Sequence, residues 1–316
     1  MKKYKVGLLG VGGITLRHIP AWLKHEDAEL VAMCDIRPEQ MEKYPEIRHY
    51  TDYYEMMENE ELDILDIALP TFLHAQYAED ALNRGLHVFC EKPISLKKED
   101  VQRLYSAAEK NNVCFMVGHS VRFGDQYQLL RNIIKDGRYG KLLSGKLFRL
   151  SAMPNWSWDG WMQDPKRSGG VACDLHIHDL DFMVYALGAP KSHKSYRTQY
   201  PGKDYIFATY DYGDFFVNIE AAWYGCPHPF HSGFSFQFEK AVITWDKAFK
   251  AIYLENGEII DLSQPEPEAL GGMNIMNTPS HEREFKYFVD CIKAGKPADM
   301  IKPEELEAVL SIIETM

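Results

Sequence analysis

The chain has 316 residues, 46% of them hydrophobic, with 35 basic and 46 acidic side chains and a net charge of −11. This length suits about two domains, and the apolar content excludes a largely disordered chain. The acidic balance disfavours a nucleic-acid partner, which needs clustered positive potential, and no apolar run approaches the ~18 residues of a membrane span.

The amino-terminal segment and the cysteines indicate a protein of a reducing compartment. Met1-Lys2-Lys3-Tyr4-Lys5 imitates the charged region of a signal peptide, but the glycine-rich segment after it contains no small-residue cleavage site. No CxxC pair occurs, so a zinc ribbon or finger has no support. We expect a soluble, cytoplasmic protein without a metal, in which all six cysteines are reduced core residues.

In the first third of the chain, short apolar runs alternate with helical patterns. Strands are expected at Val6–Leu9, Leu30–Cys34, Ile64–Leu69, His87–Cys90 and Cys114–Val117. Helices are expected at Ile14–Lys24, Pro38–Lys43, Tyr53–Glu58, Leu73–Arg84 and Lys98–Asn111. This alternation is typical of right-handed βαβ units. Because it stops near Val121–Gly124, we predict an α/β domain over residues 1–122, a Rossmann-type doubly wound parallel sheet.

Residues 123–316 are expected to form an α+β domain with a large, mostly antiparallel open sheet. Helices are predicted at Gln126–Lys135, Val171–Leu187, His281–Ala294 and Pro303–Glu314. Strands are predicted at Leu142–Leu150, Tyr205–Tyr212, Phe215–Trp223, Ser232–Phe238 and Ala241–Trp245, with a hairpin turn at Asn256-Gly257. The Pro- and Gly-rich stretch Ser263–Gly272 is expected to be a loop. The last helix is free to pack back on the first domain.

The turn between the first strand and the first helix is rich in glycine. Gly10 permits the tight turn, and Gly12 lets the backbone approach a pyrophosphate. Beyond Gly13, the helix beginning at Ile14 presents free N–H groups and its positive dipole end. Thr15 replaces the third glycine of GxGxxG, so an ordinary βα turn in an unrelated α/β protein is the alternative.

An acidic residue at the end of the second strand strengthens the nucleotide interpretation. Asp35 comes 25 positions after Gly10 (35 − 10), close to the carboxylate expected about 20 positions on that binds a ribose 2′-OH. A carboxylate there repels the extra phosphate of NADP, which favours NAD. Arg37 could accommodate that phosphate, so NADP is the alternative.

Glu91-Lys92-Pro93 directly follows the strand at His87–Cys90. A residue just beyond the carboxyl end of such a strand faces the crevice where open α/β sheets bind ligands. Pro93 pushes Lys92 toward an extended conformation. A partly desolvated lysine beside a cationic nicotinamide is a usable acid or base; the alternative is a solvated surface charge.

A second polar cluster follows Gly169-Gly170. On the predicted helix, Asp174 and His178 are four positions apart and share one face, with Asp181 nearby, so a carboxylate can orient an imidazole. If the segment were a strand, His176 and His178 would share a face and could bind a metal. The apolar spacing favours the helix, and we expect His176 to be a packed or hydrogen-bonded histidine.

Together, the glycine turn, Glu91-Lys92-Pro93 and the pattern Gly-Gly-x-x-x-Asp-x-x-x-His-x-x-Asp resemble the Gfo/Idh/MocA family, which includes glucose–fructose oxidoreductase and inositol 2-dehydrogenase. The likeness covers essentially the whole chain. Pro70-Thr71-Phe72-Leu73-His74 is similar to the family's Pro-Asn-x-x-His segment near the nicotinamide, with Thr71 replacing Asn. Arg122-Phe123 resembles the Arg-Phe at the domain junction. His176 stands where many members have Gly, which marks a subgroup.

The resemblance implies that Lys92 and His178 are the catalytic pair and that Asp174 positions the substrate hydroxyl or the lysine. A hydroxyl carbon would deliver hydride to nicotinamide C4 while His178, assisted by Lys92, removes the hydroxyl proton. Cofactor contacts are expected from Gly10, Gly12, Gly13, Ile14, Asp35, Arg37, Pro70, Thr71, His74, Glu91 and Lys92. Substrate contacts are expected from Arg122, Trp161, Asp174 and His178. A homodimer or homotetramer through the second domain's sheet is also implied.

The segment Trp156-Ser157-Trp158-Asp159-Gly160-Trp161 precedes the Asp174/His178 cluster. Aromatic faces pack against the C–H face of a pyranose or inositol ring, so a cyclic polyol would fit beside Trp161. An aromatic core or interface cluster is an equally weighted alternative.

We therefore predict an NAD(H)-dependent oxidoreductase acting on a CH–OH group of a sugar, polyol or inositol-like compound. One alternative keeps the fold and uses transient oxidation to cleave a glycoside with NAD recycled, recruiting a metal through His176 and neighbouring acids. Another is a non-catalytic, NAD-sensing regulator. The presence of Lys92, Asp174 and His178 argues against the regulator.

Overall fold

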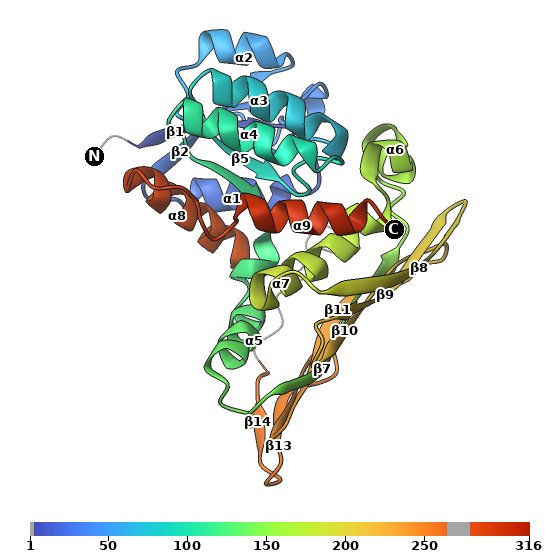
Figure 1. The fold of residues 1–316 in the computed structure, drawn as a ribbon. Coiled ribbons are helices and arrows are strands. Elements are labelled where there is room, and N and C mark those ends of the chain that lie inside the picture. The colour runs from blue at the N-terminus through green and yellow to red at the C-terminus, as the bar shows by residue number, and fades with distance from the viewer. Residues whose placement is uncertain (1–2, 264–278) are drawn as a thin grey trace. The chain divides into compact units, whose positions relative to one another are not determined.

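The computed structural model describes residues 3–263 and 279–316, and its ribbon is drawn in Figure 1. The chain divides into two compact units: the first combines Met1–Ser120 with Pro279–Glu307, and the second combines Val121–Thr278 with Ala308–Met316. Of the expected loop Ser263–Gly272, all but Ser263 lies outside the described residues.

The first unit is built on a six-stranded sheet. Its strands are β1 (Tyr4–Leu9), β2 (Ala28–Cys34), β3 (Arg48–Tyr50), β4 (Ile64–Ile67), β5 (His87–Glu91) and β6 (Phe115–Gly118). They lie in the order β3-β2-β1-β4-β5-β6, and every neighbouring pair is parallel. This confirms the predicted doubly wound sheet. The strand order reverses between β1 and β4, where such sheets bind ligands beyond their carboxyl ends.

The helices of the first unit come from both ends of the chain. They are α1 (Thr15–Leu23), α2 (Tyr53–Asn59), α3 (His74–Asn83), α4 (Glu99–Lys110), α8 (Ser280–Lys293) and the first turns of α9 (Pro303–Ile313). The indole of Trp22 on α1 stacks on the ring of Phe285 on α8, with centroids 4.1 Å apart. The unit therefore includes a helix that follows almost all of the second unit in sequence.

One predicted helix of the first unit is wrong. Pro38–Lys43 was expected to be helical, but only the 3₁₀ turn η1 (Pro38–Gln40) forms, and none of its residues is buried. Most helical stability in proteins comes from packing an apolar face, and Met41 is the only buried residue of this segment.

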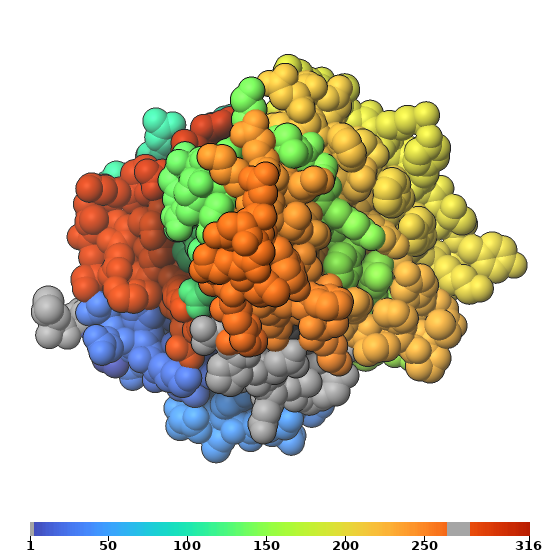
Figure 2. All heavy atoms as spheres, turned by 90° about the horizontal axis from the view of Figure 1, so that it is seen from below, coloured from blue at the N-terminus to red at the C-terminus, as the bar shows by residue number. Residues whose placement is uncertain are grey.

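The second unit is built on an eight-stranded sheet. Its strands are β7 (Leu142–Ala152), β8 (Ser192–Tyr200), β9 (Lys203–Asp211), β10 (Phe216–Tyr224), β11 (His231–Phe238), β12 (Ala241–Trp245), β13 (Lys250–Leu254) and β14 (Ile259–Asp261). The order is β14-β13-β12-β11-β7-β10-β9-β8, and only the β7–β10 pair among them is parallel. The mostly antiparallel sheet is confirmed, as is the Asn256-Gly257 hairpin between β13 and β14. Figure 2 shows this end of the sheet, in orange, at the surface.

The helical segments of the second unit are α5 (Asp125–Asp136), the 3₁₀ segment η4 (Trp158–Gln163), α6 (Pro165–Ser168), the π-helical turn η5 (Ala172–His176) and α7 (Ile177–Leu187). In Figure 1, α5 and α7 lie on one side of the sheet. Along β9, Ile206, Ala208 and Tyr210 are buried, whereas Phe207 and Thr209 between them are half-exposed. This period-2 alternation distinguishes the two faces of the sheet.

The predicted continuous helix over Val171–Leu187 is interrupted. Five residues, Ala172–His176, form a π-helical turn before the regular helix α7 begins at Ile177. Because of this π-turn, Asp174 and His178 do not have the regular α-helical spacing from which their shared face was predicted. Single π-turns inside α-helices occur often at functional sites.

The described residues bear on the predicted absence of a membrane span and on the predicted burial of the cysteines. Among those residues, no helix combines the length and apolar character needed to cross a bilayer. Five of the six cysteines are buried as predicted, but Cys226 is exposed. The core assignment is wrong for Cys226 because it lies beyond the end of β10, outside the sheet.

Candidate functional site

The glycine turn of the first unit has the geometry of a nucleotide cradle. Gly10 has a φ of +89°, and a side chain there would come within 2.7 Å of the carbonyl oxygen of Ala68. A side chain at Gly12 would meet no protein atom within 4 Å. Thr15, which replaces the third glycine, donates its hydroxyl to the Gly12 carbonyl at 2.6 Å. The backbone conformation thus requires glycine at position 10, and the backbone at Gly12 is accessible to a ligand. The Thr15 hydroxyl bond stabilises the turn at the start of α1.

Asp35 lies against this turn, as the sequence predicts. Its Oδ2 accepts a hydrogen bond from the Val11 N–H at 2.8 Å, and its Oδ1 accepts from the Arg37 N–H at 2.9 Å and from Arg37 Nε at 3.1 Å. The Arg37 guanidinium is therefore paired with Asp35. A 2′-phosphate would have to displace Arg37 from that pair and approach a carboxylate, which favours NAD.

The loops after β4 and β5 are joined by His74. Its Nδ1 lies 2.7 Å from the Pro93 carbonyl oxygen, and its Nε2 lies 2.7 Å from the Leu69 carbonyl oxygen. The ring is buried, and burial lowers the pKa of His74 against the opposing effect of these two carbonyls. The structure therefore gives His74 a structural role, and its contact with the cofactor stays a prediction. Thr71, which starts the 3₁₀ turn η2 (Thr71–Leu73), is buried as well.

Glu91 ends β5 with its carboxylate turned into the unit. Its Oε1 lies 3.0 Å from His18 Nε2, and its Oε2 accepts the Lys92 backbone N–H at 3.1 Å. Burial disfavours the charged form, but the bond to His18 and its charge lower the pKa of Glu91 to about 2. Glu91 is thus a buried anion that fixes the start of the Lys92 loop, and its contact with the cofactor stays a prediction.

Sequence reasoning missed two partners in this region, His18 on α1 and Asp66 on β4. His18 Nδ1 lies 2.9 Å from Asp66 Oδ2, and both side chains are fully buried. Asp66 could have indicated this contact from the sequence, because an acidic residue inside the apolar run Ile64–Ile67 needs a buried partner.

In the second unit, α7 is anchored by two buried acids that directly follow His178. The Arg149 guanidinium of β7 donates a hydrogen bond of 2.8 Å to the Asp179 carboxylate. The Arg122 guanidinium donates two hydrogen bonds, of 2.8 and 2.6 Å, to the Asp181 carboxylate. Both ion pairs are buried. Two rigid neighbours therefore fix the position from which His178 projects.

Arg122 lies in a buried ion pair. Its guanidinium is fully buried, is bound by the Asp181 carboxylate and lies 4.6 Å from the ring centroid of Tyr185. The structure thus shows a structural role for Arg122, and its contact with a substrate stays a prediction.

Asp174 and His178 are both accessible. Between Val171 and Val184 they are the two residues that are not buried. The π-turn alters their spacing and still leaves both on the accessible side of the segment. Of the nearby aromatic segment, Trp161 is half-exposed and Trp156 is 57% exposed, so this segment is not core.

His176 is the hydrogen-bonded histidine that the sequence predicts. Its Nε2 lies 2.6 Å from the Tyr210 hydroxyl, and the ring is fully buried. Burial, followed by the charges of Arg197 and His193, lowers the pKa of His176 to about 3. The helical backbone also excludes the strand arrangement in which His176 and His178 share a face.

The neutral state of His176 predicts a pH dependence of stability. Between pH 3 and 6.5 the unfolded chain binds a proton at this position that the folded chain does not. Stability is therefore lost as the pH falls below about 6.5, by about 2 kcal/mol at pH 5 from this group. We expect His176→Gln to reduce the difference in unfolding free energy between pH 7 and pH 5 by about that amount. Urea titrations of the variant and of His49→Gln, an exposed control, check this; an unchanged difference in His176→Gln would contradict it.

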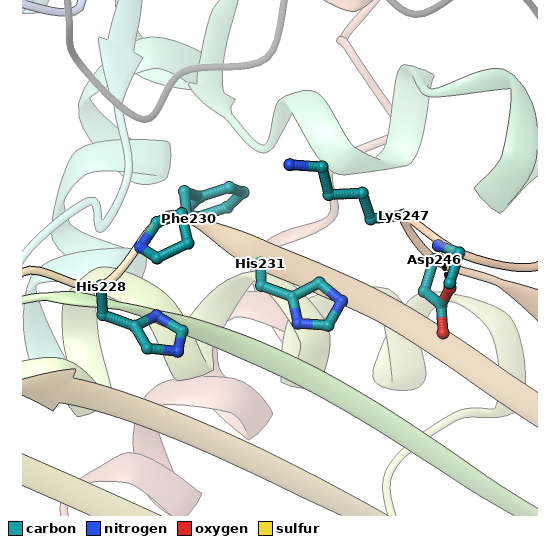
Figure 3. Close-up of a pocket in the computed structure, with 7 residues that line it drawn as sticks. His228, Phe230, His231, Asp246 and Lys247 are labelled. Carbon is teal, nitrogen blue, oxygen red and sulfur yellow. Dashed lines mark hydrogen bonds between the residues drawn. The ribbon is translucent and has the colours of Figure 1, made fainter.

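A hollow of about 350 Å³ lies elsewhere in the second unit, at the turns beside β11 and β12. Figure 3 shows His228, Phe230 and His231 on the segment leading into β11, and Asp246 and Lys247 on the turn after β12. The Asp246 carboxylate is already bonded to the Ala248 and Phe249 N–H groups at 2.7 Å. None of the predicted site residues lines this hollow, so we do not assign it to the reaction.

The predicted site residues thus form two groups. Gly10 to Lys92 gather at the carboxyl ends of β1, β2, β4 and β5 in the first unit, while Trp161, Asp174 and His178 belong to the second. Chemically, the first group can hold an anionic dinucleotide, and the second offers a carboxylate and an imidazole for proton transfer.

Comparison with known proteins identifies two family profiles in the chain. Residues 4–119 match the profile described as an oxidoreductase family with an NAD-binding Rossmann fold, and residues 127–244 match the GFO/IDH/MocA C-terminal domain. The two matches lie one in each compact unit.

Similar curated proteins include sugar and polyol dehydrogenases. D-Apiose dehydrogenase of Paraburkholderia graminis is 29% identical over 60% of this chain and 51% of its own, and inositol 2-dehydrogenase of Salmonella typhimurium is 27% identical over 65% and 60%. The matched part thus spans between half and two thirds of these relatives. The crystal structure of scyllo-inositol dehydrogenase from Lactobacillus casei with NAD(H) and scyllo-inositol has the same fold, with a TM-score of 0.77 and 20% identity over 100% of this chain and 96% of that one.

Proposed function

The chain belongs to the Gfo/Idh/MocA family of NAD-binding oxidoreductases, and from that membership we propose that it transfers hydride between NAD and a CH–OH group of a sugar, polyol or inositol-like compound. The observation that carries the proposal is the cradle at Gly10–Gly13 with Asp35 hydrogen-bonded to it. The relatives named inositol and apiose dehydrogenase support the substrate class.

The residues of the first unit fit the dinucleotide. The backbone at Gly12 is open to a pyrophosphate, and the amino-terminal end of α1 adds the positive end of its helix dipole. Asp35 offers carboxylate oxygens for a ribose hydroxyl. NAD, when bound, supplies the acceptor for the hydride.

The proton is handled by side chains of this chain. We assign His178 as the base that takes the hydroxyl proton, with Lys92 assisting and Asp174 orienting the hydroxyl. The ion pairs of Asp179 and Asp181 hold His178 in a fixed position, which lowers the cost of bringing the reacting groups together. The proposal requires that Lys92 and His178 act in the same proton transfer. Trp161 is proposed to cover the apolar face of a ring.

Incubating the protein with NAD and a panel of sugars, polyols and inositols tests this function. We expect NADH absorbance to rise with at least one cyclic polyol or sugar. Product release from a glycoside without net NADH would favour cleavage by transient oxidation. Tight NAD binding with no turnover on the whole panel would favour a regulator, and either result would overturn the dehydrogenase.

Asp35 should control the choice between NAD and NADP. We expect Asp35→Ala and Asp35→Asn to lower the ratio of kcat/KM for NAD to that for NADP by about tenfold or more, since a like-charge repulsion of about 1.4 kcal/mol is removed. Glu39→Ala, which removes an exposed acid just beyond Arg37, is the matched control. An unchanged ratio in both Asp35 variants would show that the ribose contact lies elsewhere.

We also propose that the half-exposed face of the second unit's sheet joins subunits into a homodimer or homotetramer. Strand register places Tyr196, Phe207, Glu220 and Phe148 in one row across four strands. Tyr196 is 60% exposed, and Phe207 and Phe148 are half-exposed. Aromatic side chains in such a row are typical of subunit contacts. Sedimentation equilibrium tests the assembly, and a monomer at all concentrations would exclude it.

A further inference from the structure

The buried side of α1 holds a histidine between two carboxylates from different strands. His18 Nδ1 lies 2.9 Å from Asp66 Oδ2, and His18 Nε2 lies 3.0 Å from Glu91 Oε1. Neutral imidazole has one N–H, and a carboxylate can only accept. With both carboxyl groups ionised, as the lowered pKa of Glu91 supports, both contacts are hydrogen bonds only if both ring nitrogens carry protons, so the geometry favours a cationic His18.

The surroundings of His18 support this charge. Burial disfavours it, but the charges and hydrogen bonds of Asp66 and Glu91 outweigh burial and raise the pKa of His18 to about 10. The His281 ring of α8 is 5.8 Å away, and burial followed by the charge of His18 lowers the pKa of His281 to about 3, so that ring is neutral. The positive charges nearby are those of Arg17 and Lys92, which act on His281 and Glu91 respectively.

The chain of contacts leads from α1 to the Lys92 loop. Trp22 Nε1 donates to Asp66 Oδ2 at 2.8 Å, which fixes Asp66 on the same oxygen that holds His18. On the other side, Glu91 bonds His18 with one oxygen and the Lys92 backbone N–H with the other. The backbone of Lys92 is therefore tied to α1 through a buried ionic network.

We propose that His18 is a positioning residue: its cationic ring, held by Asp66, fixes the Glu91 carboxylate and through it the backbone of Lys92, so that the lysine stands in place for proton transfer. The inference rests on the proposed function, in which Lys92 assists the transfer. His18 itself does not touch the substrate or the cofactor in this role.

A bound cation is the competing interpretation of the same atoms. Among the described residues, ligand atoms of His18, Glu91 and His281 lie within 4.8 Å of one another. Zinc at about 2.1 Å from each ligand would hold them about 3.4 Å apart, so the wider contacts would have to contract. The His18–Glu91 contact of 3.0 Å already has hydrogen-bond length and occupies the nitrogen that a metal would need. A proton explains the geometry without any movement.

Nitrogen NMR of the histidines in the full chain tests the charge independently of activity. At about pH 8.5, where ordinary histidines are neutral, we expect both ring nitrogens of His18 to be protonated. The His18 signals are identified by their loss in His18→Gln. A neutral His18 ring would overturn the proposal. So would a stoichiometric divalent cation in the purified protein that His281→Gln removes.

Steady-state kinetics test the positioning. A glutamine amide can donate to one carboxylate only, so His18→Gln should lower kcat by about tenfold to a hundredfold through misplacement of Lys92, with the Kd of NAD close to wild type. For oxidation of the hydroxyl, the rising limb of the pH–rate profile should move to higher pH, because a positive charge near the reacting groups is lost. Asp66→Asn should also lower kcat and move the rising limb to higher pH. It replaces His18→Gln in the test if that variant does not fold.

His281→Gln is the matched control, because it removes a neighbouring imidazole whose buried Nδ1 makes no hydrogen bond. It should retain the wild-type kcat and pH profile. Wild-type kinetics in both His18→Gln and Asp66→Asn would overturn the positioning role even if His18 is cationic. Wild-type turnover in Lys92→Ala would instead contradict the proposed function. It would not affect the NMR result on the charge of His18.

Discussion

Replacement of Lys92 by alanine is expected to leave NAD binding intact and to lower turnover by roughly a hundredfold or more, the usual loss when a general acid–base group is removed. Lys92 follows β5 at the crevice of the sheet, and its backbone N–H is bonded to a buried Glu91, so truncating its side chain leaves the loop's anchor in place. Titration of NAD by fluorescence and initial rates at saturating NAD measure the two effects separately.

Lys97→Ala is the matched control for Lys92→Ala, because Lys97 is an exposed lysine five positions further along the same loop. It should retain wild-type kcat. A double variant, Lys92→Ala with His178→Ala, tests whether the two groups work together. If they act in the same proton transfer, the double variant will be about as slow as the slower single one. Multiplied losses would show that the two side chains act separately.

Replacement of Asp181 by alanine is expected to lower the unfolding free energy by about 3–5 kcal/mol, because the buried Arg122 guanidinium loses both of its bonds to this carboxylate. Asp136→Ala removes the partner of Arg138 in an exposed pair of the same unit and should cost about 0–1 kcal/mol. Urea unfolding at pH 7 measures both. A small loss in Asp181→Ala would mean that water reaches the guanidinium.

The double replacement Arg122→Met with Asp181→Leu removes both charges. It therefore separates the destabilisation caused by one buried charge without its partner from the contribution of the ion pair to the unfolding free energy. Apolar side chains of similar volume often replace a buried ion pair at little or no cost. We expect this variant to recover most of the stability lost in Asp181→Ala. Recovery of stability without recovery of turnover would show that the pair serves chiefly to orient α7 and His178.

The parallel sheet was predictable because the strands of the first unit are buried on both faces and therefore read as continuous apolar runs. β3 escaped notice because it has three residues, none of them buried. β8 was missed for a related reason: its polar sequence, Ser192–Tyr200, is exposed or half-exposed along its whole length. Both strands owe their form to a neighbouring strand's hydrogen bonds, which no local pattern reveals.

The candidate site was predictable where backbone chemistry dictates the residue. A positive φ demands Gly10, and a carboxylate at the end of β2 stands beside the turn because the adjacent strands are parallel. The network of His18, Asp66 and Glu91 could not be predicted, since it joins three segments whose contact depends on the packing of α1. The ion pair of Arg122 with Asp181 was not predicted either, because the resemblance at Arg122 says nothing of this bond.

The return of α8 to the first unit has a consequence for biosynthesis. Trp22 has its stacking partner in Phe285, and Asp27 has its ion-pair partner in Lys293, both near the carboxyl end. On the ribosome, the amino-terminal region must therefore wait with the Trp22 side of α1 uncovered until some 260 further residues have been translated (285 − 22 = 263). The nucleotide-binding unit, although its strands are made first, is thus completed only after most of the second unit has been translated.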